Sequence, residues 1–114
     1  MNFLIKLLLS AISVIITSYL LDGVSVDNFM IALIVAAVLA LLNTIVRPIL
    51  VFLTIPITIV TLGLFLLVIN AVIILITDSI IPGFVVDGFW WALLFSIIVS
   101  ILNALFQSLG NDTK

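Results

Sequence analysis

Four long apolar stretches dominate the chain and leave it few ways to fold. Each is about 19 residues long, and as an α-helix each would measure about 28 Å, enough to cross the hydrocarbon core of a bilayer. With 67% hydrophobic and 7% charged residues, the chain has too little polar surface for a water-soluble fold. The sequence therefore predicts an all-α integral membrane protein, a single transmembrane domain over residues 1–114. The expected transmembrane helices run from Phe3 to Leu21, Asn28 to Val46, Gly63 to Ile81 and Gly88 to Phe106.

An internal repeat relates the first half of the chain to the second. A shift of 60 residues aligns residues 4–45 with residues 64–105 without a gap. Such self-similarity is typical of duplicated structural units. We therefore expect two tandem helix hairpins, each with a short outer loop that contains Gly and Asp. The informative matches are Ala11 with Ala71, Thr17 with Thr77, Gly23 with Gly83, Asp27 with Asp87, Phe29 with Phe89, Ala32 with Ala92, and Asn43 with Asn103.

Basic and acidic side chains fall at opposite ends of the expected helices. The basic residues at one end are Lys6, Arg47 and Lys114, and the acidic residues at the other are Asp22, Asp27, Asp78 and Asp87. By the positive-inside rule, both termini and Arg47 are expected on the cytoplasmic side. The first apolar stretch resembles the core of a signal peptide. Because no small-residue cleavage site follows it before Asp22, we expect the stretch to be retained as a helix.

The apolar segment over residues 47–62 joins the two hairpins and is interrupted by Pro48 and Pro56. A fifth crossing would place Asp78 and Asp87 inside, which the charge distribution opposes. We expect a proline-broken element on the cytoplasmic side, either re-entrant, interfacial or a kinked extension of the third transmembrane helix. Hydroxyl groups on one face of this segment can bond carbonyls that the prolines leave free. They belong to Thr54, Thr58 and Thr61.

Three asparagines and one arginine are the candidate polar residues inside the membrane. The amides of Asn43, Asn70 and Asn103 need partners that lipid does not offer, so they predict hydrogen bonds between helices, with a polar path or ligand site as the alternative. Arg47 is expected to be a topology anchor whose side chain reaches the interface. A gating or lipid-headgroup role is the alternative for Arg47.

Small residues recur every fourth position in the second and fourth helices. This spacing lets helix backbones approach closely and predicts helix packing, within one chain in preference to between chains. The two sets are Ala32, Ala36 and Ala40, and Ala92, Ser96 and Ser100. Asp27 and Asp87 each precede a helix, where a carboxylate can cap free amide groups. An acidic outer mouth that attracts cations is the other interpretation of these two carboxylates.

The composition removes most enzymatic and nucleic-acid functions. The chain has no Cys and no His, so it lacks disulfides, thiol chemistry, the usual zinc ligands and the usual general base. Its net charge of −2 provides no basic patch for nucleic acid. We therefore predict no catalytic residue, no metal site and no cofactor. The lipid bilayer and a second copy of the chain are the expected partners, and no small-molecule substrate is indicated.

A central motif resembles a family of small bacterial membrane proteins, the phage-holin-like, YvlD-type family. The motif comprises Asn43, Arg47-Pro48, Leu53-Thr54, Pro56, Thr58, Thr61-Leu62-Gly63-Leu64-Phe65 and Asn70, followed by Gly83-Phe84 and Gly88-Phe89. The resemblance covers nearly the whole chain and implies a four-helix protein of the bacterial cytoplasmic membrane. The short tail after Phe106 has no charged cluster and departs from many phage holins.

These observations predict a non-catalytic structural or oligomeric membrane component. Two alternatives stay open. A holin-type protein would assemble into pores and release ions or dye from vesicles, whereas a small transporter or channel subunit would bind a substrate near Asn70.

Overall fold

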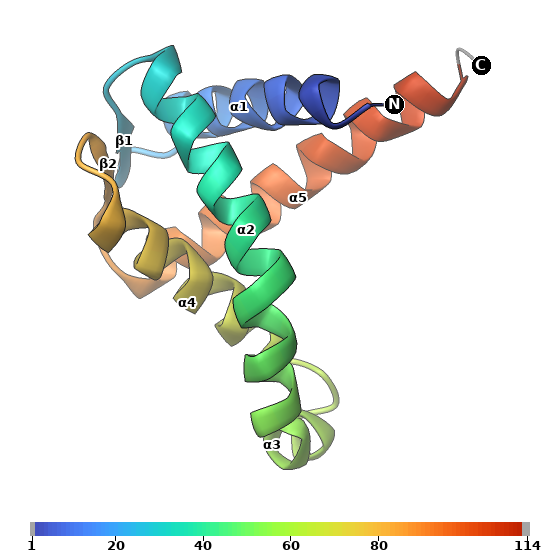
Figure 1. Cartoon of the computed structure of the whole chain (residues 1–114). Helices are drawn as coiled ribbons and strands as arrows, with labels where there is room; N and C mark the ends of the chain where they lie inside the picture. Colours follow the sequence, from blue (N-terminus) through green and yellow to red (C-terminus); the bar gives the residue numbers. More distant parts are fainter. Residues whose placement is uncertain (1, 113–114) are drawn as a thin grey trace.

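Helices account for most of the computed structural model, which describes residues 2–112 (Figure 1). In chain order the elements are α1 (Phe3–Leu20), β1 (Val24–Val26), α2 (Phe29–Leu53), α3 (Ile55–Val60), α4 (Phe65–Ile80), β2 (Phe84–Val86) and α5 (Phe89–Asp112). Helices α1, α2 and α5 are long and apolar enough to cross a membrane, and α4 is a shorter apolar helix of 16 residues. The all-helical body with four apolar helices agrees with the sequence prediction.

Two helices extend well past their expected C-terminal bounds. Helix α2 continues past Val46 to Leu53, and α5 continues past Phe106 to Asp112. Pro48 lies inside α2 and has no N–H to donate. The other amides of this apolar segment still need partners, and continuing the helix supplies them. The first half of the connecting segment therefore extends the second apolar helix, which differs from all three expected arrangements of this segment.

A break at Thr54 separates α2 from the short helix α3. Thr54 has φ −107° and ψ 12°, outside the helical range, and Pro56 follows in the first turn of α3. A proline is tolerated there because the first amides of a helix have no partner within the helix. The chain then reverses through Leu62 and Gly63, whose φ angles are 57° and 89°. This turn explains why α4 begins at Phe65 and not at Gly63.

The two segments expected as outer loops pair with each other in a small antiparallel sheet. Val24, Ser25 and Val26 of β1 face Val86, Val85 and Phe84 of β2. The backbone N–H of Asp27 donates to the Gly83 carbonyl at 2.9 Å, and that of Asp87 donates to the Gly23 carbonyl at 2.8 Å. Ser25 and Val85 are equivalent under the 60-residue shift, and the other contacts fall into symmetric sets that the shift exchanges, such as Val24 with Val86 and Val26 with Phe84.

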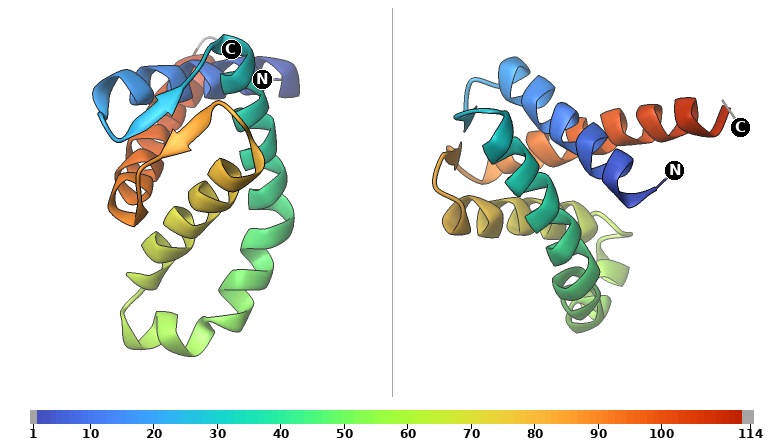
Figure 2. Two further views of the ribbon diagram at one scale, coloured as in Figure 1. Left: turned by 90° about the vertical axis from the view of Figure 1, so that its left-hand side faces the viewer. Right: turned by 45° about the horizontal axis from the view of Figure 1, so that its top comes forward.

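The apolar core lies next to this sheet. Phe84 and Phe95 are almost fully buried, and their ring centroids are 5.5 Å apart. Helix α1 packs against α2 and α5, and α4 packs against the same two helices. Each of the four helices therefore contacts one helix of its own hairpin and one of the other hairpin. From the sheet, α2 and α5 diverge in different directions (Figure 2). The strand end is therefore close-packed, and the opposite end is splayed.

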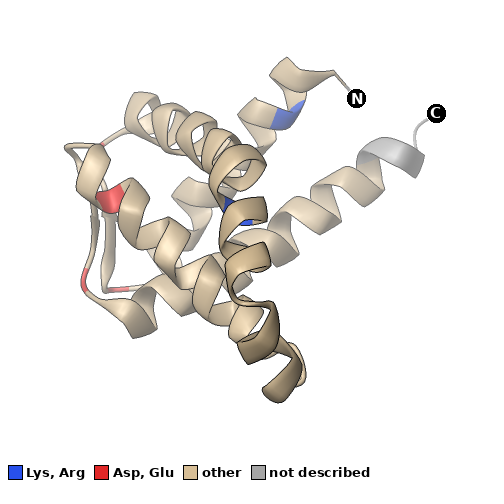
Figure 3. Cartoon of the chain, turned by 60° about the horizontal axis from the view of Figure 1, so that its bottom comes forward, with Lys and Arg blue, Asp and Glu red and all other residues tan. Residues whose placement is uncertain are grey.

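Charged groups follow the same division. Asp22, Asp27 and Asp87 flank the two strands in the chain, and Asp78 Oδ2 accepts from the Val86 amide of β2, whereas Lys6 lies in α1 and Arg47 in α2. In Figure 3 the red positions of the ribbon lie at the strand end and the blue positions lie away from it. One expected role is wrong, because Asn28 and not Asp27 caps α2, its Oδ1 accepting from the Ile31 amide at 2.9 Å. The Asp27 carboxylate instead lies close to Gly83, where an added Cβ would be 2.9 Å from Oδ2.

Candidate functional site

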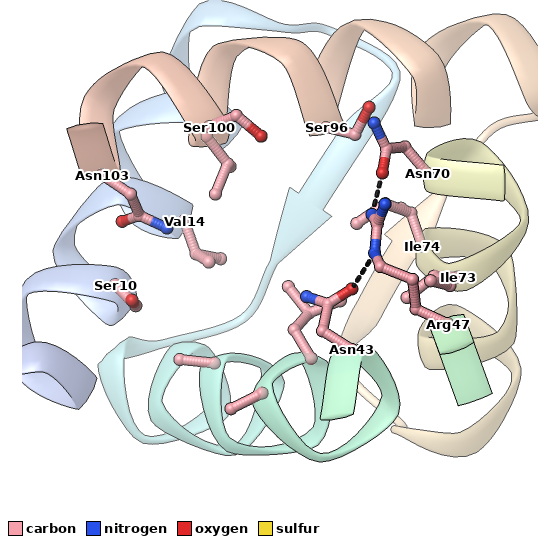
Figure 4. A pocket seen from close by; sticks show the side chains of 14 residues that line it. Ser10, Val14, Asn43, Arg47, Asn70, Ile73, Ile74, Ser96, Ser100 and Asn103 are labelled. Carbon is pink, nitrogen blue, oxygen red and sulfur yellow. Dashed lines mark hydrogen bonds between the residues drawn. The ribbon is translucent and has the colours of Figure 1, made fainter. Parts of the chain in front are cut away.

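A polar pocket of about 160 Å³ lies between α1, α2, α4 and α5 (Figure 4). Apolar side chains such as Val14, Leu39 and Ile74 form part of its wall. The rest is polar, which is unusual among membrane helices. The polar lining residues are Ser10 from α1, Asn43 and Arg47 from α2, Asn70 from α4, and Ser96, Ser100 and Asn103 from α5. All three candidate asparagines and the candidate arginine therefore meet in one place.

Arg47 connects two of the four helices through this pocket. Its Nε donates to Asn43 Oδ1 at 3.2 Å, one helical turn earlier on α2. Its Nη2 donates to Asn70 Oδ1 on α4. Because a guanidinium group only donates hydrogen bonds, the amide oxygens of both asparagines must face it. We expected Arg47 to extend toward the interface, but its half-buried side chain turns into the protein instead.

A second polar contact joins α1 to α5. The Ser13 hydroxyl is fully buried and lies 3.0 Å from Asn103 Oδ1 and 3.0 Å from the Leu9 carbonyl oxygen. Neither Ser13 nor the pocket residue Ser10 was among the residues predicted from the sequence. A signal for Ser10 was present, because the 60-residue shift aligns it with Asn70.

The small residues of α2 and α5 divide between the core and the pocket. Ala32 and Ala92 are fully buried beside the core. The remaining four, Ala36, Ala40, Ser96 and Ser100, line the pocket. Their short side chains leave the space that larger residues would fill.

The other candidate residues, in the connecting segment, do not line the pocket. Pro48 lies inside α2, and Pro56 lies in the first turn of α3. The hydroxyls of Thr54 and Thr61 donate to the carbonyls of Leu50 and Ile57, at 2.7 and 3.0 Å. The Thr58 hydroxyl is buried and has no partner among the described residues. Two of the three expected threonine contacts are thus present, and the one at Thr58 is wrong.

The chemistry of the pocket is that of a hydrogen-bond donor site. Its lining contains one cation, Arg47, and no aspartate or glutamate. Within residues 2–112, no group of three or more His, Cys, Asp or Glu residues could hold a metal ion. Arginine and asparagine side chains bind and orient polar groups, but the lining offers no nucleophile activated by a neighbouring base.

Comparison with known proteins identifies the family. Residues 1–105 match the family model described as "Mycobacterial 4 TMS phage holin, superfamily IV". The chain belongs to this family. It is 36% identical over 104 residues to the uncharacterized membrane protein YvlD of Bacillus subtilis, covering 90% of this chain and 87% of the relative. It is 39% identical over 112 residues to the uncharacterized protein SCO3922 of Streptomyces coelicolor, covering 90% of each chain. No solved structure matches the chain.

The matches confirm the resemblance seen in the central motif and agree with a membrane protein of four transmembrane segments. The names of both relatives assign no activity. The role of this protein therefore has to be argued from its own geometry.

Proposed function

We propose that this protein is a non-catalytic component of the bacterial cytoplasmic membrane, with the polar residues of its crossing helices gathered around one pocket in each chain. Its four crossings form two tandem hairpin units, residues 4–45 and 64–105, joined by the proline-broken segment over residues 47–62. Both termini and this segment face the cytoplasm. The bilayer is its solvent, and a second copy is its candidate partner. The complete absence of Cys and His supports the non-catalytic role.

The direction of the polar side chains carries this proposal. Ser10, Asn43, Arg47, Asn70, Ser96, Ser100 and Asn103 line one pocket within a single chain. The exposed positions of the crossing helices include large apolar side chains such as Ile12 on α1, Ile34 on α2, Leu66 on α4 and Leu94 on α5. A water-filled pore between subunits needs a polar outward face, whereas the polar residues named here line one pocket within a single chain. We therefore favour a sealed unit over a lytic pore.

The makeup of the pocket supports the two-unit arrangement. All of its lining residues except Arg47 and Ile73 form pairs that stand 60 positions apart. The pairs are Ser10 with Asn70, Val14 with Ile74, Ala36 with Ser96, Leu39 with Val99, Ala40 with Ser100, and Asn43 with Asn103. Together with the pairing of Ser25 and Val85 at the centre of the sheet, they favour an approximate twofold axis through both the sheet and the pocket.

A vesicle leakage assay tests the proposal. Purified protein is incorporated into liposomes that contain a self-quenching dye, with a lytic peptide as the positive control. Sealed vesicles are expected at protein densities that give many copies per vesicle. Dye release that rises with protein density would overturn the sealed unit and support the holin-type pore. The mass of the protein in detergent, measured by light scattering, shows whether a second copy is bound.

The small-transporter alternative is also favoured by one observation, the contact of Arg47 with Asn70 inside the pocket. A transporter would require the pocket to open to both sides in turn. Uptake of a labelled ligand into sealed vesicles would distinguish transport from binding alone.

A further inference from the structure

We infer that the pocket around Arg47 binds a phosphate group, presented either by an anionic lipid headgroup or by a free phosphate. The inference adds a ligand class to the proposed function and rests on the pocket facing the cytoplasm. The supporting observations are the charge of the pocket lining, the directions of the amide groups in that lining, and the size and opening of the pocket.

The charge of the lining favours an anion. Arg47 is the cation in the lining, which includes no carboxylate to neutralise it. Its two contacts to Asn43 and Asn70 go to neutral amide oxygens. A guanidinium has five N–H donors in a planar fork that matches the oxygens of a phosphate. Two described bonds therefore leave donors of Arg47 available to a ligand.

The asparagines add donors of the same kind. Asn43 and Asn70 each direct Oδ1 toward Arg47, so the part of each amide left for a ligand is the NH₂ group. In Figure 4 the amide nitrogens of Asn43 and Asn103 point toward the space between the helices. The hydroxyls of Ser10 and Ser100 lie on the same lining. A group with several acceptor oxygens can use these donors together, which favours phosphate over a monatomic anion.

The size of the pocket limits the ligand to a headgroup or a small ion. Pockets that enclose a complete drug-sized molecule usually measure about 300 Å³ or more. The volume here, about 160 Å³, is smaller. Asn43 and Ser100 are partly exposed, on α2 and α5, the two helices that diverge from the sheet (Figure 2). A larger molecule could therefore place its phosphate inside while its remaining part stays outside.

Thermal unfolding in an uncharged detergent tests the inference. The probes are inorganic phosphate, dihexanoyl phosphatidylglycerol and dihexanoylglycerol, which lacks the phosphate, all at ionic strength matched with sodium chloride. At least one phosphate-bearing probe is expected to raise the unfolding temperature of the unmodified protein, with a saturable dependence on concentration. A response to inorganic phosphate identifies a soluble anion as a sufficient ligand, and a response to the phospholipid alone identifies a headgroup.

Two variants and one matched control locate the site. Arg47→Gln removes the pocket cation and should weaken binding by about tenfold to a hundredfold, since hydrogen bonds to charged groups contribute that much. Lys6→Gln removes the same charge from an exposed position outside the pocket and should bind as the unmodified protein does. Asn43→Asp places a carboxylate one turn from Arg47, so it should fold at least as well and yet lose binding.

Three results would overturn the phosphate site. They are no stabilisation by either phosphate-bearing probe, equal stabilisation by dihexanoylglycerol and the phospholipid, and unchanged binding in both Arg47→Gln and Asn43→Asp. Because binding is measured in detergent, it is independent of the vesicle leakage that tests the proposed function. A protein that leaks and binds phosphate would therefore contradict the proposed function alone. A protein that stays sealed and does not bind phosphate would contradict the phosphate site alone.

Discussion

The strand end and the splayed end of the molecule solve different packing problems. At the strand end, buried side chains at equivalent positions of the two hairpins are mostly apolar. The buried polar pair Thr17 and Thr77 forms hydrogen bonds within its own helices, because each hydroxyl donates to the carbonyl four residues earlier. At the splayed end, equivalent positions surround the polar pocket, and Arg47 is matched by Gln107 in the other hairpin. The comparison shows that the buried apolar core lies at the strand end, whereas the polar contacts between helices lie at the splayed end.

The largest expected effect concerns which side of the membrane each end faces. Because the chain has no cysteine, single substitutions give a clean background for labelling with a membrane-impermeant thiol reagent. Ser25→Cys and Val85→Cys, both at exposed strand positions, should react only from outside. Val60→Cys, at an 82% exposed position, should react only from the cytoplasm. Labelling of positions 25 and 85 from opposite sides would refute the two-hairpin arrangement.

The second prediction compares one substitution in the core with the same one on the surface. Phe95→Ala removes a fully buried ring that packs on Phe84. The free energy of unfolding should fall by about 2 kcal/mol or more, because a cavity remains where the ring was. Phe52→Ala, at a 72% exposed position of α2, should change it by less than about 0.5 kcal/mol. Unfolding in mixed detergent measures both, and equal losses would show that the core is misplaced.

The third prediction uses two alanines two turns apart on α2. Ala32→Leu enlarges a fully buried residue and should destabilise the protein by about 1 to 3 kcal/mol through overpacking. Ala40→Leu places the same side chain beside the pocket, where it has space, and should cost less. The difference in unfolding temperature between the two variants is the measurement. If Ala40→Leu proved the more damaging, the pocket would be a packed region and not an open one.

The smallest expected effect lies in the connecting segment. Thr58→Val removes a buried hydroxyl that has no partner in the described residues, so stability should stay unchanged or rise slightly. Thr54→Val removes a hydroxyl that donates to the Leu50 carbonyl and should cost about 0.5 to 1.5 kcal/mol. A loss at Thr58 as large as that at Thr54 would indicate that the Thr58 hydroxyl has a partner in the membrane.

The sequence alone determined the membrane location, the family and the four apolar helices. Each of these properties depends on hydrophobicity summed over a long stretch or on a local motif such as Arg47-Pro48. A membrane helix also satisfies its backbone groups within one segment, so its presence does not depend on its neighbours. The helix ends were less predictable. Pro48 ended the predicted helix near Val46, yet the need of the other amides for partners carried α2 on to Leu53.

Only the tertiary structure decided the sheet and the pocket. Strands of three residues are too short to form alone, and β1 exists because β2, 60 positions away, supplies its partner. The asparagines were identifiable as polar residues in apolar helices, but their meeting with Arg47, Ser10 and Ser100 depends on how the four helices cross. The direction of the Arg47 side chain also depends on how the helices pack. Asn70 on α4 lies within its reach, and a bond there replaces the extension to the interface that an isolated helix would favour.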